Sequence, residues 1–138
     1  SALQPADRSI RYQNVRSALA EEGVIRLLMQ DESLFPPEMP VRPEEFSSPL
    51  LGRIYGELWQ RRGHASMAAL AAVLTPEEMN HLTALLQKPE SAANAPQALA
   101  DYIRIIREEY TKRTGGTDPL AAAMETYKDK KGYGGKRT

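Results

Sequence analysis

The sequence predicts an all-α protein, a bundle of about five to six helices followed by a short C-terminal helical hairpin. Three observations lead to this fold class. Apolar residues recur at helical spacing, prolines and capping residues mark several helix starts, and no segment alternates apolar and polar residues over the length of a strand. The chain has 138 residues, 41% of them hydrophobic, which suits one domain or one domain with an appendage.

The first helix is expected to begin at Ser9 or Val15 and to end at Gln30. Its second half is almost entirely apolar and includes Leu28, so this helix should lie in the centre of the bundle. Gly23 precedes that half, although glycine costs about 1 kcal/mol relative to alanine inside a helix. We expect this glycine to let another helix approach closely.

The segment from 31 to 48 holds four prolines, which stop any long helix. Ser47 or Ser48 can cap the next helix, because a serine hydroxyl accepts a hydrogen bond from an unpaired N–H of the first turn. Pro49 follows at the first helical position, and the helix should end near Arg62. The apolar stripe of this helix and one loop aromatic are expected core residues: Leu51, Ile54, Tyr55, Leu58 and Phe46.

A short helix capped by Ser66 should reach Leu74, and another helix should start directly after it. Thr75 and Glu78 have the spacing of a capping box, in which each side chain accepts from the other residue's backbone N–H. Pro96 opens a longer helix with an apolar stripe at helical spacing. That stripe adds three expected core residues: Tyr102, Ile103 and Ile106.

We expect three parts along the chain. Residues 1–8 would be a polar linker or leftover leading residues, since the chain begins with Ser1 rather than Met. Residues 9–95 would form the helical bundle. Residues 96–138 would form the last bundle helix, the helical hairpin and a basic tail, with the final helix starting at Asp118 after a glycine-rich break.

The residue types give little support to catalytic or metal chemistry. The chain has no cysteine, and its two histidines, His64 and His81, lie in a turn and in a helix, whereas catalytic zinc normally takes three protein ligands. Both histidines are therefore expected at the surface or at helix caps. Adjacent glutamates point about 100° apart on a helix and do not converge on one substrate bond. The pair at 77–78 complements a helix start, and the other pairs are expected on solvated faces or at partner contacts: 21–22, 44–45 and 108–109. We therefore expect no catalytic residue, no metal site and no cofactor.

Charge and hydropathy limit the partners. The formal net charge is zero, which argues against a grip of the whole domain on nucleic acid. No apolar run approaches the roughly 20 residues of a membrane span, and no signal peptide is visible. We expect no membrane contact, and the absence of cysteine is compatible with the cytoplasm.

The C-terminal region is the expected partner-binding site. Five basic side chains and one acidic side chain between residues 128 and 138 leave a charge of +4. A last helix outside the bundle would expose apolar side chains, as a helix that docks in a groove does. The expected contact residues are Leu120, Met124, Tyr127, Lys128, Lys130, Lys131 and Tyr133. The residues alone leave three readings open: contact with an acidic protein surface, contact with nucleic acid, or a solvated tail.

The stretch from Val41 to Trp59 is the most specific part of the sequence. An acidic loop ending in Phe46-Ser47 is followed, after a short spacer, by Arg53-Ile54-Tyr55 on a helix. This pattern resembles the C-terminal helicase-binding domain of bacterial DNA primase and the related N-terminal domain of the replicative hexameric helicase. Three further stretches are similar to the primase family: 19–35, 98–107 and 128–135. The primase domain is the better match, because the helicase domain would continue into a linker and an ATPase.

The resemblance implies a non-catalytic adaptor. It would recruit primase, the nucleotidyltransferase that synthesises RNA primers, to the N-terminal collar of the hexameric helicase, and it would modulate primer synthesis and helicase activity during DNA replication. The fragment would be cytoplasmic and monomeric on its own, with weak or absent direct binding to nucleic acid. Two alternatives are an N-terminal self-association domain of a replicative helicase and a small helical nucleic-acid-binding module.

Overall fold

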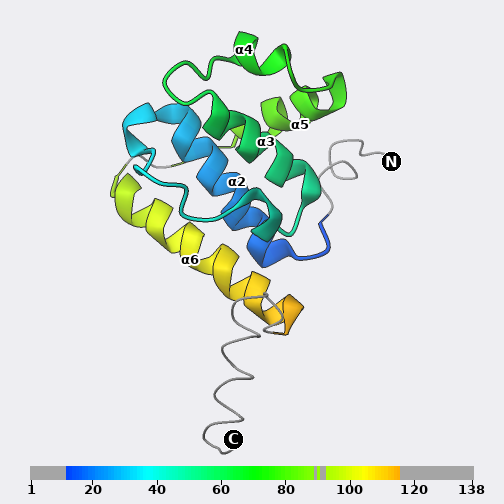
Figure 1. Cartoon of the computed structure of the whole chain (residues 1–138), viewed down its shortest axis with the longest axis vertical. Helices are drawn as coiled ribbons and strands as arrows, with labels where there is room; N and C mark the ends of the chain where they lie inside the picture. The colour runs from blue at the N-terminus through cyan, green and yellow to red at the C-terminus, as the bar shows by residue number, and fades with distance from the viewer. Residues whose placement is uncertain (1–11, 89, 91–92, 116–138) are drawn as a thin grey trace, which may run out of the picture. The chain divides into compact units, whose positions relative to one another are not determined.

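The computed structural model describes residues 12–88, 90 and 93–115, and these residues are helical and contain no strand (Figure 1). The predicted all-α fold class is therefore confirmed for the described part of the chain. The α-helices are α2 (Val15–Gln30), α3 (Pro49–Gln60), α4 (Met67–Ala71), α5 (Pro76–Leu86) and α6 (Ala95–Thr114), and two 3₁₀ turns are η1 (Glu32–Leu34) and η2 (Pro43–Glu45). The expected linker at 1–8 and the expected helix from Asp118 lie outside the described residues.

The chain forms two compact units, residues 1–107 and residues 108–138, and the boundary between them lies within α6. The helical bundle belongs to the first unit.

Helix α2 begins at Val15 because Asn14 caps it. The side-chain oxygen of Asn14 accepts from the backbone nitrogen of Ser17 at 3.1 Å. Of the two expected starts, Val15 is therefore the observed one. Every residue from Ala20 to Leu28 is buried, so α2 is the central helix, as its apolar second half predicted.

Gly23 brings α6 close to α2, as expected from its place inside a helix. A Cβ atom on Gly23 would lie 2.6 Å from Cζ of Tyr102, much closer than carbon atoms pack in protein interiors. The Tyr102 ring of α6 therefore occupies the space that any larger residue at this position would need.

Ser48, and not Ser47, caps α3. Its Oγ accepts from a backbone N–H of the first helical turn at 3.2 Å. The helix ends at Gln60, two residues before the predicted end at Arg62. Arg62 still contacts the helix end, because its Nη1 donates to the backbone oxygen of Trp59 at 2.8 Å.

Local capping chemistry also sets α4 and α5. Ser66 caps α4, which ends at Ala71 and stops short of the predicted end at Leu74. The capping box predicted for α5 is present. The backbone nitrogen of Thr75 donates to Glu78 Oε1 at 2.8 Å, and the backbone nitrogen of Glu78 donates to Thr75 Oγ1 at 3.1 Å.

The hydrophobic core draws on all of the described α-helices, from α2 to α6. Seven expected core residues are at most 5% exposed: Leu28, Phe46, Leu51, Ile54, Tyr55, Leu58 and Ile106. The other two, Tyr102 and Ile103, are only half-buried and pack against the edge of the core. The hydroxyl of Tyr102 points to the Glu90 carboxylate, which keeps this end of the side chain out of the apolar interior.

Candidate functional site

The expected partner-binding residues at the C-terminal end all lie outside the described residues: Leu120, Met124, Tyr127, Lys128, Lys130, Lys131 and Tyr133. Two groups of contacts stand out in the part of the first unit that the structure describes. One group fixes the segment 41–59, which carries the resemblance to primase and helicase domains. The other group is a chain of polar side chains, some buried and some partly buried, which we call the polar chain.

Glu21 on α2 is fully buried, and its carboxylate lies at the N-terminus of α3. Its Oε2 accepts from the backbone nitrogen and the hydroxyl of Ser47, each at 2.7 Å, and its Oε1 accepts from the backbone nitrogen of Ser48 at 3.2 Å. The hydroxyl of Ser17 donates to Oε2 at 2.6 Å. The carboxylate satisfies N–H groups that lack helical partners and is favoured by the helix dipole. Glu21 therefore attaches the start of α3 to α2.

The segment 41–59 is also fixed by contacts within itself. The Tyr55 hydroxyl donates to the backbone oxygen of Val41 at 2.8 Å, and the rings of Phe46 and Tyr55 have centroids 4.5 Å apart. Burial raises the pKa of Tyr55, so the hydroxyl keeps its proton and remains a donor. Glu45 is buried and closes η2 by accepting from a backbone N–H at 2.8 Å. Because these contacts join the loop to the helix, we call residues 41–59 the loop–helix module.

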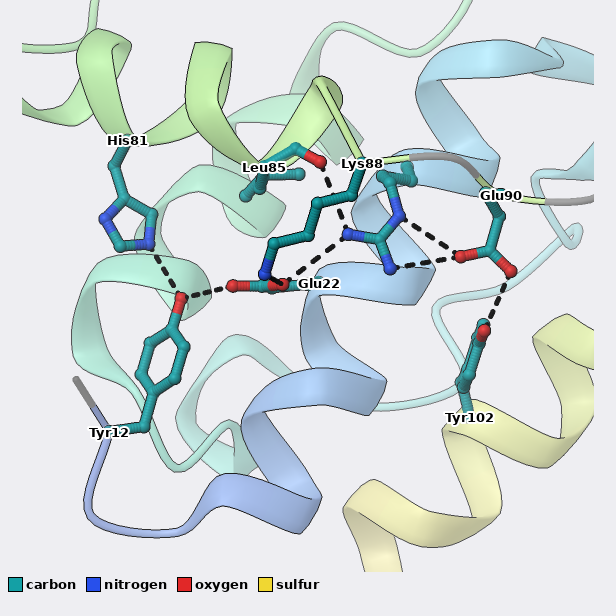
Figure 2. Close-up of polar contacts among 8 residues, drawn as sticks. Tyr12, Glu22, His81, Leu85, Lys88, Glu90 and Tyr102 are labelled. Carbon is teal, nitrogen blue, oxygen red and sulfur yellow. Dashed lines mark hydrogen bonds and ion pairs between the residues drawn. The ribbon is translucent and has the colours of Figure 1, made fainter. Parts of the chain in front are cut away.

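The polar chain is centred on Glu22 of α2, which is fully buried (Figure 2). The Tyr12 hydroxyl donates to Glu22 Oε2 at 2.6 Å, and Nε2 of His81 lies 2.7 Å from the same Tyr12 oxygen. The single hydroxyl proton of Tyr12 is used in the hydrogen bond to Glu22, so the Tyr12 oxygen can only accept from His81. We therefore assign to His81 the tautomer with a proton on Nε2, which donates to Tyr12. Glu22 Oε1 accepts from Lys88 Nζ at 2.9 Å and from Arg26 Nη1 at 3.5 Å.

These contacts shift the pKa values of three groups. Burial by itself raises the pKa of Glu22, but hydrogen bonds from Tyr12 and Lys88, together with the nearby positive charges, bring it below its ordinary value. Burial strongly raises the pKa of Tyr12, and its hydrogen bond to the Glu22 carboxylate adds to this effect. Burial lowers the pKa of His81, because the charged imidazolium would lose its hydration.

The polar chain continues through Arg26 to α6. Glu90 Oε1 lies 3.1 Å from both Nε and Nη2 of Arg26, and Glu90 Oε2 accepts from the Tyr102 hydroxyl at 2.8 Å. Nη1 of Arg26 also donates to the backbone oxygen of Leu85 on α5, at 3.3 Å. Figure 2 shows that the contacts run without a break from Tyr12 to Tyr102 on α6.

The polar chain is suited to positioning helices. Two carboxylates, Glu22 and Glu90, face two cations, Arg26 and Lys88, so the formal charges balance. Paired and hydrogen-bonded charges are tolerated in an interior, whereas removing one partner leaves an uncompensated charge. The polar chain therefore holds α2, α5 and α6 against one another.

A shallow depression of about 390 Å³ lies beside the loop–helix module, and it is lined by Tyr12, Gln13, Ser47, Ser48 and Pro49. Its three hydroxyls already have partners inside the protein: Glu22, Glu21 and the first turn of α3. The depression is therefore built from groups that hold the fold.

Two expectations about polar residues are wrong. Glutamates from three of the pairs expected on solvated faces or at partner contacts are buried: Glu21, Glu22, Glu45 and Glu109. His81, expected at the surface or at a cap, is 6% exposed, whereas His64 is exposed. These contacts were missed because the partners are distant along the chain, as Tyr12 and His81 are, 69 residues apart. The available signal was a pair of carboxylates next to the largely apolar second half of this helix.

Apolar side chains also reach the surface of the bundle. Val15 is 57% exposed and Leu19 is 49% exposed, and the two lie one turn apart on the same side of α2. We call this pair the α2 patch. Two further large apolar side chains are exposed elsewhere, Met39 and Met67.

Within residues 12–88, 90 and 93–115, no group of three or more His, Cys, Asp or Glu side chains is arranged to hold a metal ion. No helix in this part of the chain is both long enough and apolar enough to cross a membrane. Comparisons with models of protein families, with curated proteins and with solved structures found no match.

Proposed function

We propose that this chain is the non-catalytic helicase-binding domain of a bacterial DNA primase. In this role it recruits the primase to the N-terminal collar of the replicative hexameric helicase. It thereby modulates primer synthesis and helicase activity during DNA replication, which implies a cytoplasmic location.

The loop–helix module carries the proposal. The residues on which the resemblance depends include Glu45, Phe46 and Tyr55, and each makes a specific contact within the module. The spacing between Phe46 and Tyr55 matters because their rings meet across the start of the helix. These contacts give the residues of the resemblance a defined structural role in this chain, and the all-α bundle around them suits such a domain.

The proposed contact with the helicase lies at the C-terminal end of the chain. Leu120, Met124 and Tyr127 have the spacing of one helix face, and basic residues follow them. Buried apolar and aromatic anchors supply most of the energy in protein interfaces, and a charged rim mainly affects the association rate and the register. We therefore assign the affinity to the three apolar residues and the salt dependence to the basic ones.

The test is calorimetric titration of the cognate hexameric helicase with the full chain at moderate salt. The anchor variant carries Leu120→Ala, Met124→Ala and Tyr127→Ala. The control carries truncations of two exposed apolar residues that lie outside the α2 patch: Met39→Ala and Met67→Ala. A chain that ends at Gly115 keeps all of α6 and removes the whole proposed contact.

The full chain and the control variant should bind with the same affinity, while the anchor variant should lose about tenfold or more. The chain ending at Gly115 should bind no more tightly than the anchor variant. Loss of affinity in the control variant alone would move the contact to the bundle. A full chain that does not bind the cognate helicase would contradict the adaptor role.

The α2 patch favours a second candidate function, self-association of the kind found in a helicase N-terminal domain. Val15 and Leu19 expose apolar surface on one side of a helix, and a second copy of the chain could cover it. Sedimentation velocity over a range of concentrations separates the two functions. The adaptor should stay monomeric, whereas self-association should produce larger species that disappear in Val15→Ala/Leu19→Ala.

A further inference from the structure

We propose that Arg26, Glu90 and Tyr102 form a polar latch, a conformational device that decides whether α6 stays on the bundle or leaves it. The latch goes beyond the proposed helicase contact and does not depend on it. It rests on how these three residues meet and on the small number of large apolar side chains that α6 buries fully.

Glu90 is the central member of the latch, and it comes from the connection between α5 and α6. Its side chain is 10% exposed, and both carboxylate oxygens are occupied, one by Arg26 on α2 and the other by Tyr102 on α6 (Figure 2). Its backbone oxygen accepts from Gln30 Nε2 at 3.4 Å. One carboxylate therefore joins α2, the α5–α6 connection and α6 at a single point.

The apolar contacts of α6 are sparse for a helix of its length. Among its 20 residues, the large apolar side chains that are buried are Leu99 and Ile106. In contrast, the 12 residues of α3 bury five: Leu51, Ile54, Tyr55, Leu58 and Trp59. Elements with few buried apolar contacts open at lower free energy than the rest of the protein. Three further apolar side chains of α6 are partly buried against the core, Tyr102, Ile103 and Ile105, and Arg107 Nε lies 3.8 Å from Glu45 Oε1. The polar contacts at Glu90 therefore add to a modest apolar attachment of α6.

Tyr102 combines both means of attachment. Its ring fills the space above Gly23, and its hydroxyl donates to Glu90. When the hydroxyl contact breaks, the ring loses its hydrogen bond to Glu90 and keeps only apolar packing, above Gly23 and against the edge of the core, so the close approach of α6 to α2 is weakened. Tyr102 is therefore the point at which opening of the latch becomes undocking of α6.

The open state avoids the main penalty of breaking a buried ion pair. Arg26 keeps Glu22 and the backbone oxygen of Leu85 as partners after Glu90 leaves. Glu90 belongs to a connection between helices, so its carboxylate can be hydrated when α6 moves away. Because neither charge is left buried and unpaired, opening the latch avoids the largest cost of breaking a buried ion pair.

The test is hydrogen exchange of the full chain and of two latch variants, Tyr102→Phe and Glu90→Gln. Each removes polar contacts and keeps the size of the side chain. The matched control is Asp101→Asn, because Asp101 bonds only Gln97 and Arg104 in the described contacts, and both belong to α6 itself. This control reports what losing a carboxylate does to the helix without touching the latch.

In both latch variants, amides from Leu99 to Arg107 should exchange about tenfold faster than in Asp101→Asn, while amides of α3 keep their wild-type rates. Two results would overturn the proposal. One is exchange in α6 that matches the control, which would mean that the latch does not hold the helix. The other is equal acceleration in α3 and α6, which would mean that the contacts serve only the stability of the whole bundle.

Discussion

Glu21 accepts hydrogen bonds from both the backbone N–H and the hydroxyl of Ser47, each at 2.7 Å. Glu21 lies on α2, whereas Ser47 lies in the loop before α3. The carboxylate thereby occupies the N-terminus of α3, the place where many proteins bind a phosphate or sulfate ion. Here the anion is part of the chain and is fully buried. Glu21 thus links the central helix to the loop–helix module.

Replacing Glu21 with glutamine should destabilise the bundle by about 2–3 kcal/mol, in the range of hydrogen bonds to a buried charged group. The glutamine has one acceptor oxygen where four donors converge, and its NH₂ group would face other N–H or O–H donors. Urea unfolding, followed by circular dichroism, measures the change through the midpoint at constant m-value.

Glu38→Gln is the matched control for this substitution, because Glu38 is exposed in the loop before η2. Its effect should stay within about 0.5 kcal/mol, as is usual for surface substitutions. Equal effects of the two variants would mean that the charge of Glu21 does not hold the start of α3.

Stability should fall as the solution is acidified from pH 7.5 to 5.5, and His81 should be responsible. Burial lowers the pKa of His81 below its ordinary value of 6.5, so the unfolded chain takes up a proton first as pH falls. The unfolded state then binds more protons, and stability rises with pH in this window. The contribution of His81 is complete above about pH 6.5 and is lost as the pH falls toward the folded-state pKa. Thermal melts at fixed ionic strength measure this slope.

The His81→Gln variant should flatten the pH dependence between 5.5 and 7.5. Glutamine does not titrate, and its NH₂ group can still donate to the Tyr12 oxygen. Glu22 contributes at lower pH, because its pKa lies below the ordinary value of 4.5. His64→Gln, which changes an exposed histidine, should keep the wild-type slope. The assignment fails if His81→Gln melts with the same pH dependence as wild type.

The parts of the fold that follow from local chemistry were predictable. The capping box at Thr75 and a serine cap at 47 or 48 depend on neighbours within one helical turn, and the structure selects Ser48 from the two serines. The central place of α2 follows from the apolar character of its second half. The end of α4 at Ala71 was not predictable in the same way, because the next three residues, Ala72-Val73-Leu74, include no helix breaker.

The buried polar contacts were beyond prediction from the sequence. The pattern of a helix indicates which face is buried, but it does not indicate which carboxylate meets which distant donor. Glu21 bonds to Ser47, which lies 26 residues further along the sequence, and Tyr102 on α6 bonds to Glu90, which precedes that helix. The same limit explains why Tyr102 was expected in the core but is only partly buried. Its spacing placed it on the buried face of the helix but did not predict that its hydroxyl bonds to Glu90 at the edge of the core.

The contact between Gly23 and Tyr102 leads to a substitution with an unusual sign. Gly23→Ala would stabilise an ordinary helix interior by about 1 kcal/mol. Here the new methyl group would overlap the Tyr102 ring, so we expect a loss of about 1–3 kcal/mol, as in overpacked cores. In a Tyr102→Ala background the ring is gone, and the same substitution should be neutral or stabilising. Chemical unfolding of the four proteins closes this double-mutant cycle. A loss of equal size in both backgrounds would show that Tyr102 is not what excludes a side chain at residue 23.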